Sequence, residues 1–231
     1  MARIFMILSV MMLTSCQTSQ TLPLEIQTKE EKVKMMNQQL IIAAEQEDVE
    51  QVLKLLKDGA DINATDEHGR TAVMAAIYKN KTDTVKALIQ KGANINIRDE
   101  KLNNVLLYAG AEGMVDIVKI AIDAGADTKL TNRFGGTALI PAAERGHVEV
   151  VQELLLHSDI DINHINNLHW TALLEAVILG DGGETHQKIV QLLVDHGADR
   201  NITDSDGLTP LDHAQLRGFQ EIERILRNAG A

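Results

Sequence analysis

The stretch that decides the fold is Thr71-Ala72-Val73-Met74-Ala75-Ala76, a polar residue followed by a run of small and apolar residues. Runs of the same kind recur after a threonine or an asparagine, at Thr71, Asn104, Thr137, Thr171 and Thr209. Successive members of this series are 33, 33, 34 and 38 residues apart, which is the period of a helical solenoid. A second apolar stretch follows each run, so the sequence predicts an all-α array of paired helices.

Sequence marks of one family stand in phase between these units. They are Gly59-Ala60-Asp61-Ile62-Asn63, Gly92-Ala93-Asn94-Ile95-Asn96, Gly125-Ala126-Asp127, Gly146-His147-Val148-Glu149-Val150-Val151 and Gly197-Ala198-Asp199-Arg200-Asn201. With them the chain resembles the ankyrin-repeat family over about residues 37–231. The resemblance implies an ankyrin-repeat solenoid of about six helix-turn-helix repeats with short hairpin loops. The approximate repeats are 37–65, 66–98, 99–131, 132–165, 166–203 and 204–231.

Two kinds of residue are expected to build the core. Small residues such as Ala75 and Ala142 lie on the first helices, where they let neighbouring repeats approach closely. Large aliphatic residues such as Leu88 and Leu154 lie on the second helices. No repeat can bury such a face alone, so stacking must create one continuous core. This explains how a chain that is only 3% aromatic can still fold.

Repeat three departs most from the pattern. Leu102 stands where the hairpin tip carries glycine, Asn104 replaces the threonine, and Tyr108 falls inside the first helix. A leucine in a left-handed turn costs about 1–2 kcal/mol. Either the turn has changed shape or the strain is tolerated there, as a mark of function or as drift in a central repeat.

The amino end carries an export signal. Arg3 precedes an apolar run at 4–13, far shorter than the roughly 20 residues of a membrane-spanning helix. Its end, Leu13-Thr14-Ser15-Cys16, resembles the bacterial lipoprotein signal, which implies a signal peptide at 1–15 and lipidation of Cys16. The alternative is an ordinary cleaved signal or an uncleaved anchor in which Cys16 is incidental. Residues 16–36 are expected to form the lipidated end and a polar tether.

The expected location follows from the same segment. Gln17 is not the aspartate that retains lipoproteins at the inner membrane in the Gram-negative sorting pattern, so the resemblance implies an outer-membrane anchor facing the periplasm. Cys16 is the only cysteine, so no intramolecular disulfide can form. Internal initiation at Met35 or Met36 would give a minor cytosolic form.

Net charge bounds the class of partner. The chain carries a formal charge of −11, whereas a nucleic-acid-binding surface needs a basic footprint. We therefore expect no nucleic-acid partner. The expected partner is another protein, and the chain is expected to be monomeric when free.

The expected contact positions are the hairpin tips and the exposed ends of the first helices. The residues assigned to partner binding are Tyr78, Lys101, Leu102, Arg133, Phe134, Arg145, Leu168, Trp170 and Arg217. Leu102, Phe134, Leu168 and Trp170 would form an apolar stripe along three consecutive tips, and aromatic residues dominate many interfaces. For Trp170 the alternative is packing along its own hairpin.

Two insertions interrupt the period. One extra residue lies within 158–163, and five residues, Asp181-Gly182-Gly183-Glu184-Thr185, lie between the helices of repeat five. The second is expected to be a flexible loop that either contacts a partner or is neutral. A calcium site there would need several more oxygen ligands.

No catalytic or metal-binding pattern is visible. The eight histidines are scattered over different repeats without a His-Glu-x-x-His motif, and the serines have no nucleophile-elbow context. We therefore expect a protein that is not an enzyme, with no catalytic residues, no metal and no cofactor.

The resemblance to exported ankyrin-repeat lipoproteins implies a function of the immunity-protein type. Such a protein would bind and neutralise a secreted antibacterial effector in the periplasm, for example a phospholipase or lipase toxin encoded nearby. The alternatives are an accessory protein for a periplasmic enzyme such as catalase, and an envelope scaffold.

Overall fold

The computed structural model of the protein describes residues 24–228. Cys16, the expected signal peptide at 1–15 and the first part of the tether lie outside the described residues. Within residues 24–228 the chain forms twelve helices and no strand, which confirms the all-α prediction. Their bounds are α1 Leu24–Gln46, α2 Val49–Lys57, α3 Ala72–Tyr78, α4 Thr82–Gln90, α5 Val105–Ala111, α6 Val115–Asp123, α7 Leu139–Glu144, α8 Val148–His157, α9 Ala172–Ile178, α10 Glu184–Asp195, α11 Pro210–Leu216 and α12 Gln220–Asn228.

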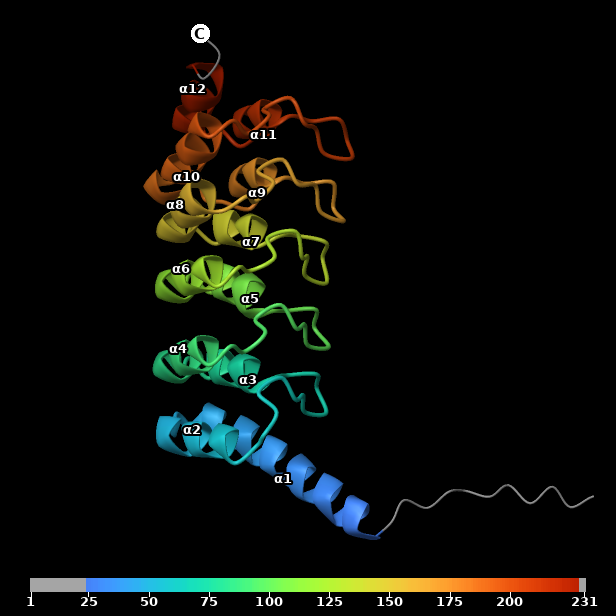
Figure 1. The fold of residues 1–231 in the computed structure, drawn as a ribbon. Helices are drawn as coiled ribbons and strands as arrows, with labels where there is room; N and C mark the ends of the chain where they lie inside the picture. The colour runs from blue at the N-terminus through green and yellow to red at the C-terminus, as the bar shows by residue number, and fades with distance from the viewer. Residues whose placement is uncertain (1–23, 229–231) are drawn as a thin grey trace, which may run out of the picture.

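The helices stack in pairs. Figure 1 shows the pairs rising from α1 and α2 to α11 and α12, with every hairpin loop projecting to the same side. The odd-numbered helices lie next to the loops and form the inner layer, whereas the even-numbered helices form the outer layer. Helices contact their counterparts in adjacent repeats, α3 with α5 and α4 with α6, for example. The predicted solenoid of six helix pairs is thereby confirmed.

Most inner helices begin as the sequence predicts, with a side chain that accepts a hydrogen bond from the backbone N–H three residues later. These caps are Thr71, Asn104, Thr171 and Thr209. Thr137 is different because Pro141 has no N–H to donate to its carbonyl. Instead the Ile140 N–H donates to that carbonyl at 3.3 Å, and α7 begins only at Leu139. The Thr137 hydroxyl is buried without a hydrogen-bond partner among the described residues.

The core runs continuously through the stack. Ala109 on an inner helix and Leu88 and Leu154 on outer helices are fully buried, as their residue types indicate. At the crossing of α5 with repeat four, a Cβ on Gly110 would lie 3.1 Å from the Cβ of Ala138. Only a very small residue fits there, so the small residues do set the close approach of neighbouring repeats.

Loop side chains link successive repeats by hydrogen bonds to the backbone of the next loop. The pairs are Asn63 with Asn94 at 2.8 Å, Asn96 with Asp127 at 2.9 Å and Asn163 with Asp199 at 2.8 Å. Between repeats three and four, Lys129 takes the place of the asparagine. There the Thr128 hydroxyl donates to Asp159 at 2.6 Å instead. The extra residue of the 158–163 insertion therefore lies next to a loop-to-loop contact in which the usual asparagine is replaced.

The first helix is much longer than the other inner helices. α1 has 23 residues, and it begins inside the segment expected as a polar tether, so the described part of that segment is helical. Lys and Glu are good helix formers, which accounts for the extension. The Asn37 side chain accepts from the Asp61 N–H at 2.8 Å, the bond that a preceding repeat would supply. Met36 packs against the core and Met35 is exposed. No helix between residues 24 and 228 is long and apolar enough to cross a membrane.

The insertion 181–185 is a loop only in its first three residues, because Glu184 and Thr185 already belong to α10. It leads into α10, and His186 beyond it is only 12% exposed at its side chain. His186 Nε2 lies 3.0 Å from the carbonyl oxygen of Glu144, which ends α7. In repeat four, His147 Nε2 lies 3.1 Å from the equivalent carbonyl of Ala111. The insertion therefore shifts a repeated histidine contact along the sequence while the contact itself is kept.

Candidate protein-binding groove

A hollow of about 410 Å³ opens between the inner helices and the hairpin tips of repeats two to five. We call this hollow the groove. Six of the nine residues predicted to bind a partner line it: Tyr78, Lys101, Arg133, Phe134, Arg145 and Leu168. The other three, Leu102, Trp170 and Arg217, do not. Most of the predicted contact residues thus lie together along one surface, and whether they bind a partner stays a prediction.

One backbone frame holds every hairpin tip. The first residue of each tip is aspartate or asparagine, and its Oδ1 accepts hydrogen bonds from the N–H groups two and four residues later. These residues are Asp66, Asp99, Asn132, Asn166 and Asp204. Because the frame is the same in five repeats, the second and third residue of each tip are presented in the same way.

The frame requires a left-handed residue in its fourth place. Glycine supplies it in three tips, for example Gly69 with φ +72°. Leu102 has φ +60°, so the turn in repeat three keeps its shape and the leucine takes the strained conformation. His169 does the same in repeat five with φ +61°, a departure that the sequence analysis missed. The tips of repeats three and five therefore each hold a non-glycine residue in a conformation that glycine normally adopts.

Two tyrosines form an aromatic cluster at one end of the groove. The rings of Tyr78 and Tyr108 meet edge to face with centroids 4.4 Å apart. The Tyr78 hydroxyl donates to Asp99 and accepts from Asn103 Nδ2 at 3.0 Å. Burial, and next the Asp99 carboxylate, raise the pKa of Tyr78 well above its usual value. The Lys101 ammonium lies 5.6 Å from the Tyr78 ring centre. This end of the groove is therefore held in place by its own side chains.

Phe134 and Leu168 form the exposed apolar surface of the groove. They lie at corresponding places on adjacent tips and are 54% and 51% exposed. The Asn167 N–H donates to the Phe134 carbonyl at 3.0 Å, which ties the two tips together. Arg133 stacks over the Phe134 ring with its guanidinium carbon 4.7 Å from the centroid. Large apolar side chains left this exposed on a rigid frame are typical of a contact surface.

A buried carboxylate lies at the opposite end from the tyrosines. Glu175 on α9 is 5% exposed, and Asn166 Nδ2 donates to its Oε1 at 2.7 Å. Loss of water, followed by the nearby charge of Glu144, raises the pKa of Glu175 to about 7, although the Asn166 hydrogen bond acts in the opposite direction. The groove therefore contains an acid that is only partly ionised at neutral pH.

Two of the predicted contact arginines also join repeats. Arg145 Nη1 donates to the Ala111 carbonyl at 2.8 Å and to Glu112 at 2.7 Å. Arg217 donates to the Ile178 carbonyl, and its guanidinium lies over the Phe219 ring. Both reach the last carbonyl of the preceding inner helix, where helices leave carbonyl groups without an internal partner. Each therefore has a structural contact, whatever its role in binding.

Trp170 does not share the groove with Phe134 and Leu168. It is partly buried and does not line the groove. Its backbone closes the repeat-five tip, since its N–H donates to Asn166 Oδ1 at 3.1 Å and its carbonyl accepts from the Asn166 N–H at 3.0 Å. The apolar stripe expected along three tips is therefore supplied in the groove by Phe134 and Leu168.

Several groove residues were not identified from the sequence as contact positions. They are Tyr108, Pro141, Asn166 and Glu175. Tyr108, Pro141 and Glu175 each stand four residues after a helix-start residue, where repeat two has Ala75. A comparison of that one position between repeats would have revealed them, because the small residue of repeat two is replaced in every later repeat, in repeat six by His213.

Comparison with known proteins identifies the repeat and its relatives. A family model described as "Ankyrin repeats (3 copies)" matches residues 40–132 and 106–204. The putative ankyrin repeat protein YahD of Escherichia coli (strain K12) is 42% identical over 199 residues, which cover 86% of this chain and 99% of YahD. An ankyrin repeat domain from Acinetobacter baumannii AYE, solved by crystallography, is 48% identical with a TM-score of 0.81. This match covers 83% of this chain and 97% of that domain.

A further relative is an enzyme that this chain matches only in part. The human NAD-capped RNA hydrolase NUDT12 is 36% identical over 76 residues, which is 33% of this chain and 15% of the hydrolase. The matched part of that enzyme is its ankyrin part, so the match brings no hydrolase chemistry to this chain. Ankyrin repeats are typically modules for protein interaction, and the groove has the exposed apolar residues of such a module.

Proposed function

The chain belongs to the ankyrin-repeat family, and on this basis we propose that it is an envelope lipoprotein that binds and neutralises a secreted antibacterial effector. Ankyrin repeats imply a protein-binding role, and the finer role is our inference. The effector would be a toxin that acts in the periplasm, for example a phospholipase or lipase encoded nearby. The protein would be held there by lipid on Cys16, outside the described residues, at the outer membrane.

One structural observation supports neutralisation by occlusion. Phe134 and Leu168 are half exposed on two adjacent tips that a shared hydrogen-bond frame holds rigid. A pre-ordered surface loses little conformational entropy on binding, so the apolar contact is available for affinity. Such a surface can cover the active site or the docking site of a partner without any catalytic step. The sequence Leu13-Thr14-Ser15-Cys16 supports the location.

The anchor is tested by replacing the cysteine. Cys16→Ala should move the protein from the membrane fraction to a soluble or unprocessed form, measured by fractionation and mass spectrometry. Ser15→Ala, which leaves Cys16 in place, is the matched control and should fractionate as the native protein does. An unchanged location and mature mass for Cys16→Ala would overturn the lipoprotein part of the proposal.

The binding role is tested by co-expression with the product of the neighbouring gene, directed to the periplasm. Native protein should protect the cells. Phe134→Ala combined with Leu168→Ala should weaken binding on the order of 30-fold or more, because buried apolar anchors dominate interfaces. Asp116→Asn on α6 is the control. Survival that does not depend on this protein, or a neighbouring catalase that it stabilises, would overturn the immunity role.

A further inference from the structure

We propose that the acidic end of the groove, formed by Glu144 and Glu175, receives an arginine or lysine side chain of the bound protein. This inference rests on the protein-binding part of the proposed function and names the chemistry of one contact in it. It does not depend on the lipid anchor or on the partner being a toxin.

The two carboxylates lack a cation. Within residues 24–228, neither the Glu144 nor the Glu175 side chain forms an ion pair, and the Glu175 carboxylate accepts a hydrogen bond from Asn166 Nδ2. Glu112, which lines the same groove, is by contrast paired with Arg145 at 2.7 Å. The acidic end is therefore the part of the groove where negative charge is not compensated from within the chain.

Burial makes this lack of a cation costly. Glu175 is 5% exposed, and a buried carboxylate without an ionic partner is unfavourable. Its raised pKa has the physical cause expected of such a site, first the loss of water and then the proximity of Glu144. A partner's cation placed between the two carboxylates would offset both effects. Binding energy would thus come from a site that is electrostatically incomplete in the free protein.

The walls around the carboxylates suit a long basic side chain. Leu168, Leu179 and Pro141 line the groove with Glu144 and Glu175. Arginine and lysine have aliphatic stems that pack on apolar walls while the charged head reaches a polar group. A small hydrated cation would make no use of these walls.

Charge along the groove also fixes a direction. Lys101 and Arg133, which carry no salt bridge among the described residues, belong to the tips of repeats three and four, whereas Glu175 belongs to repeat five. A basic residue of the partner would be repelled by Lys101 and Arg133 and attracted by the two carboxylates at the acidic end. The groove can therefore select the orientation of a bound segment as well as its composition.

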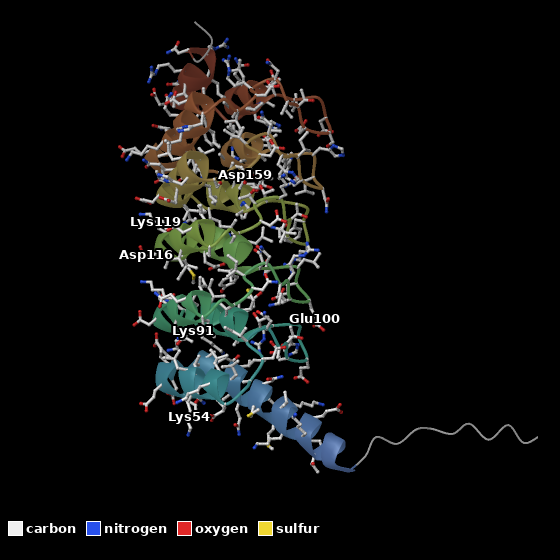
Figure 2. The ribbon with its side chains drawn as sticks, in the orientation of Figure 1. Lys54, Lys91, Glu100, Asp116, Lys119 and Asp159 are labelled. Carbon is white, nitrogen blue, oxygen red and sulfur yellow. The ribbon has the colours of Figure 1, made fainter. Side chains whose placement is uncertain are left out.

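The test uses random twelve-residue peptides displayed on phage. They are selected on the full native chain and counter-selected on the Glu144→Gln, Glu175→Gln double variant. Asp116→Asn is the control, because Asp116 lies on outer helix α6, on the side of the stack away from the tips where Glu100 lies (Figure 2). Recovered peptides are synthesised with each arginine replaced by citrulline or each lysine by its Nε-acetyl form, which keep the shape and remove the charge.

Recovered peptides should carry a basic residue next to an apolar one. Neutralising that residue should weaken binding to the native chain and to Asp116→Asn by at least about tenfold, and binding to the double variant by less than about twofold. If Glu175→Gln impairs folding by circular dichroism, Glu144→Gln alone serves as the test variant.

Two results would overturn the inference. One is that no peptide distinguishes the native chain from the double variant, and the other is that neutralisation weakens binding to both equally. Peptides that instead depend on Phe134 and Leu168 would leave the groove as a binding surface and remove only the cation contact. Failure of the proposed function would show differently, as loss of protection in co-expression.

Discussion

The outer helices and the groove follow different rules. On outer helix α8, burial follows the helical period, so Leu154 is fully buried while Leu156, two residues later, is 52% exposed. On the inner helices, the position four residues after the helix start holds Ala75 in repeat two but the groove residues Tyr108 and Glu175 in repeats three and five. Stacking dictates the first pattern and leaves the second free to vary. Residues that vary without a packing reason are therefore where binding should be sought.

The largest expected effect lies on the outer side of this comparison. Leu154→Ala should lower the free energy of unfolding by about 2–5 kcal/mol, because it removes a fully buried side chain and leaves a cavity. Leu156→Ala on the same helix is the matched control and should change it by about 0.5 kcal/mol or less. Urea denaturation measures both. Equal losses would mean that burial on α8 does not determine stability.

The second prediction concerns the buried acid of the groove. The pKa of Glu175 is raised from its ordinary 4.5 to about 7, so the folded state keeps a proton that the unfolded chain loses between these values. Stability should therefore fall as pH rises through this range, by up to about 3 kcal/mol, and be unaffected by this group below pH 4.5. Glu175→Gln should remove the fall.

The measurement is urea denaturation of the native chain and of Glu175→Gln between pH 4 and 8. Other titrating groups near α9, including Glu144 from α7 and the His213–Asp204 pair at α11, remain in both proteins. Their contributions largely cancel in the difference. A difference between the two proteins that stays constant with pH would show that Glu175 is not held in a protonated form.

The fold could be predicted from the sequence because it depends on repetition. The helix-start residues, the small residues of the inner helices and the glycines recur in phase, so several observations support each assignment. The groove could be predicted only in part, because its residues differ from one repeat to the next. Each assignment there therefore depends on a single observation. The left-handed His169 and the effect of Pro141 arise where one repeat departs from the shared pattern, and the raised pKa of Glu175 depends partly on Glu144 of the preceding repeat.

The third prediction contrasts a helix start that obeys the repeat with one that does not. Thr171 accepts a hydrogen bond from the Leu174 N–H at 3.2 Å, whereas the Thr137 hydroxyl is buried without a partner among the described residues. Thr171→Val should cost about 1 kcal/mol. Thr137→Val should instead stabilise the protein by about 1 kcal/mol, because it removes an unpaired buried hydroxyl. Thermal or urea unfolding that shows the same sign for both would contradict this account.

The smallest expected effect tests the strain beside the groove. Leu102→Gly relieves a left-handed leucine, worth about 1–2 kcal/mol, but glycine gains about 0.5–1 kcal/mol of unfolded-state entropy. The net result should be a stabilisation of about 0.5 kcal/mol. Gly207→Leu is the inverse control, because Gly207 has φ +78° and an added Cβ would meet nothing within 4 Å. It should lose about the same amount, measured by urea denaturation at matched conditions. If Gly207→Leu destabilises the protein and Leu102→Gly does so as well, the Leu102 side chain stabilises the fold by its packing. Leu102 would then be determined by packing, as the buried residues of the outer helices are, and the contrast between the two regions would not hold at this tip.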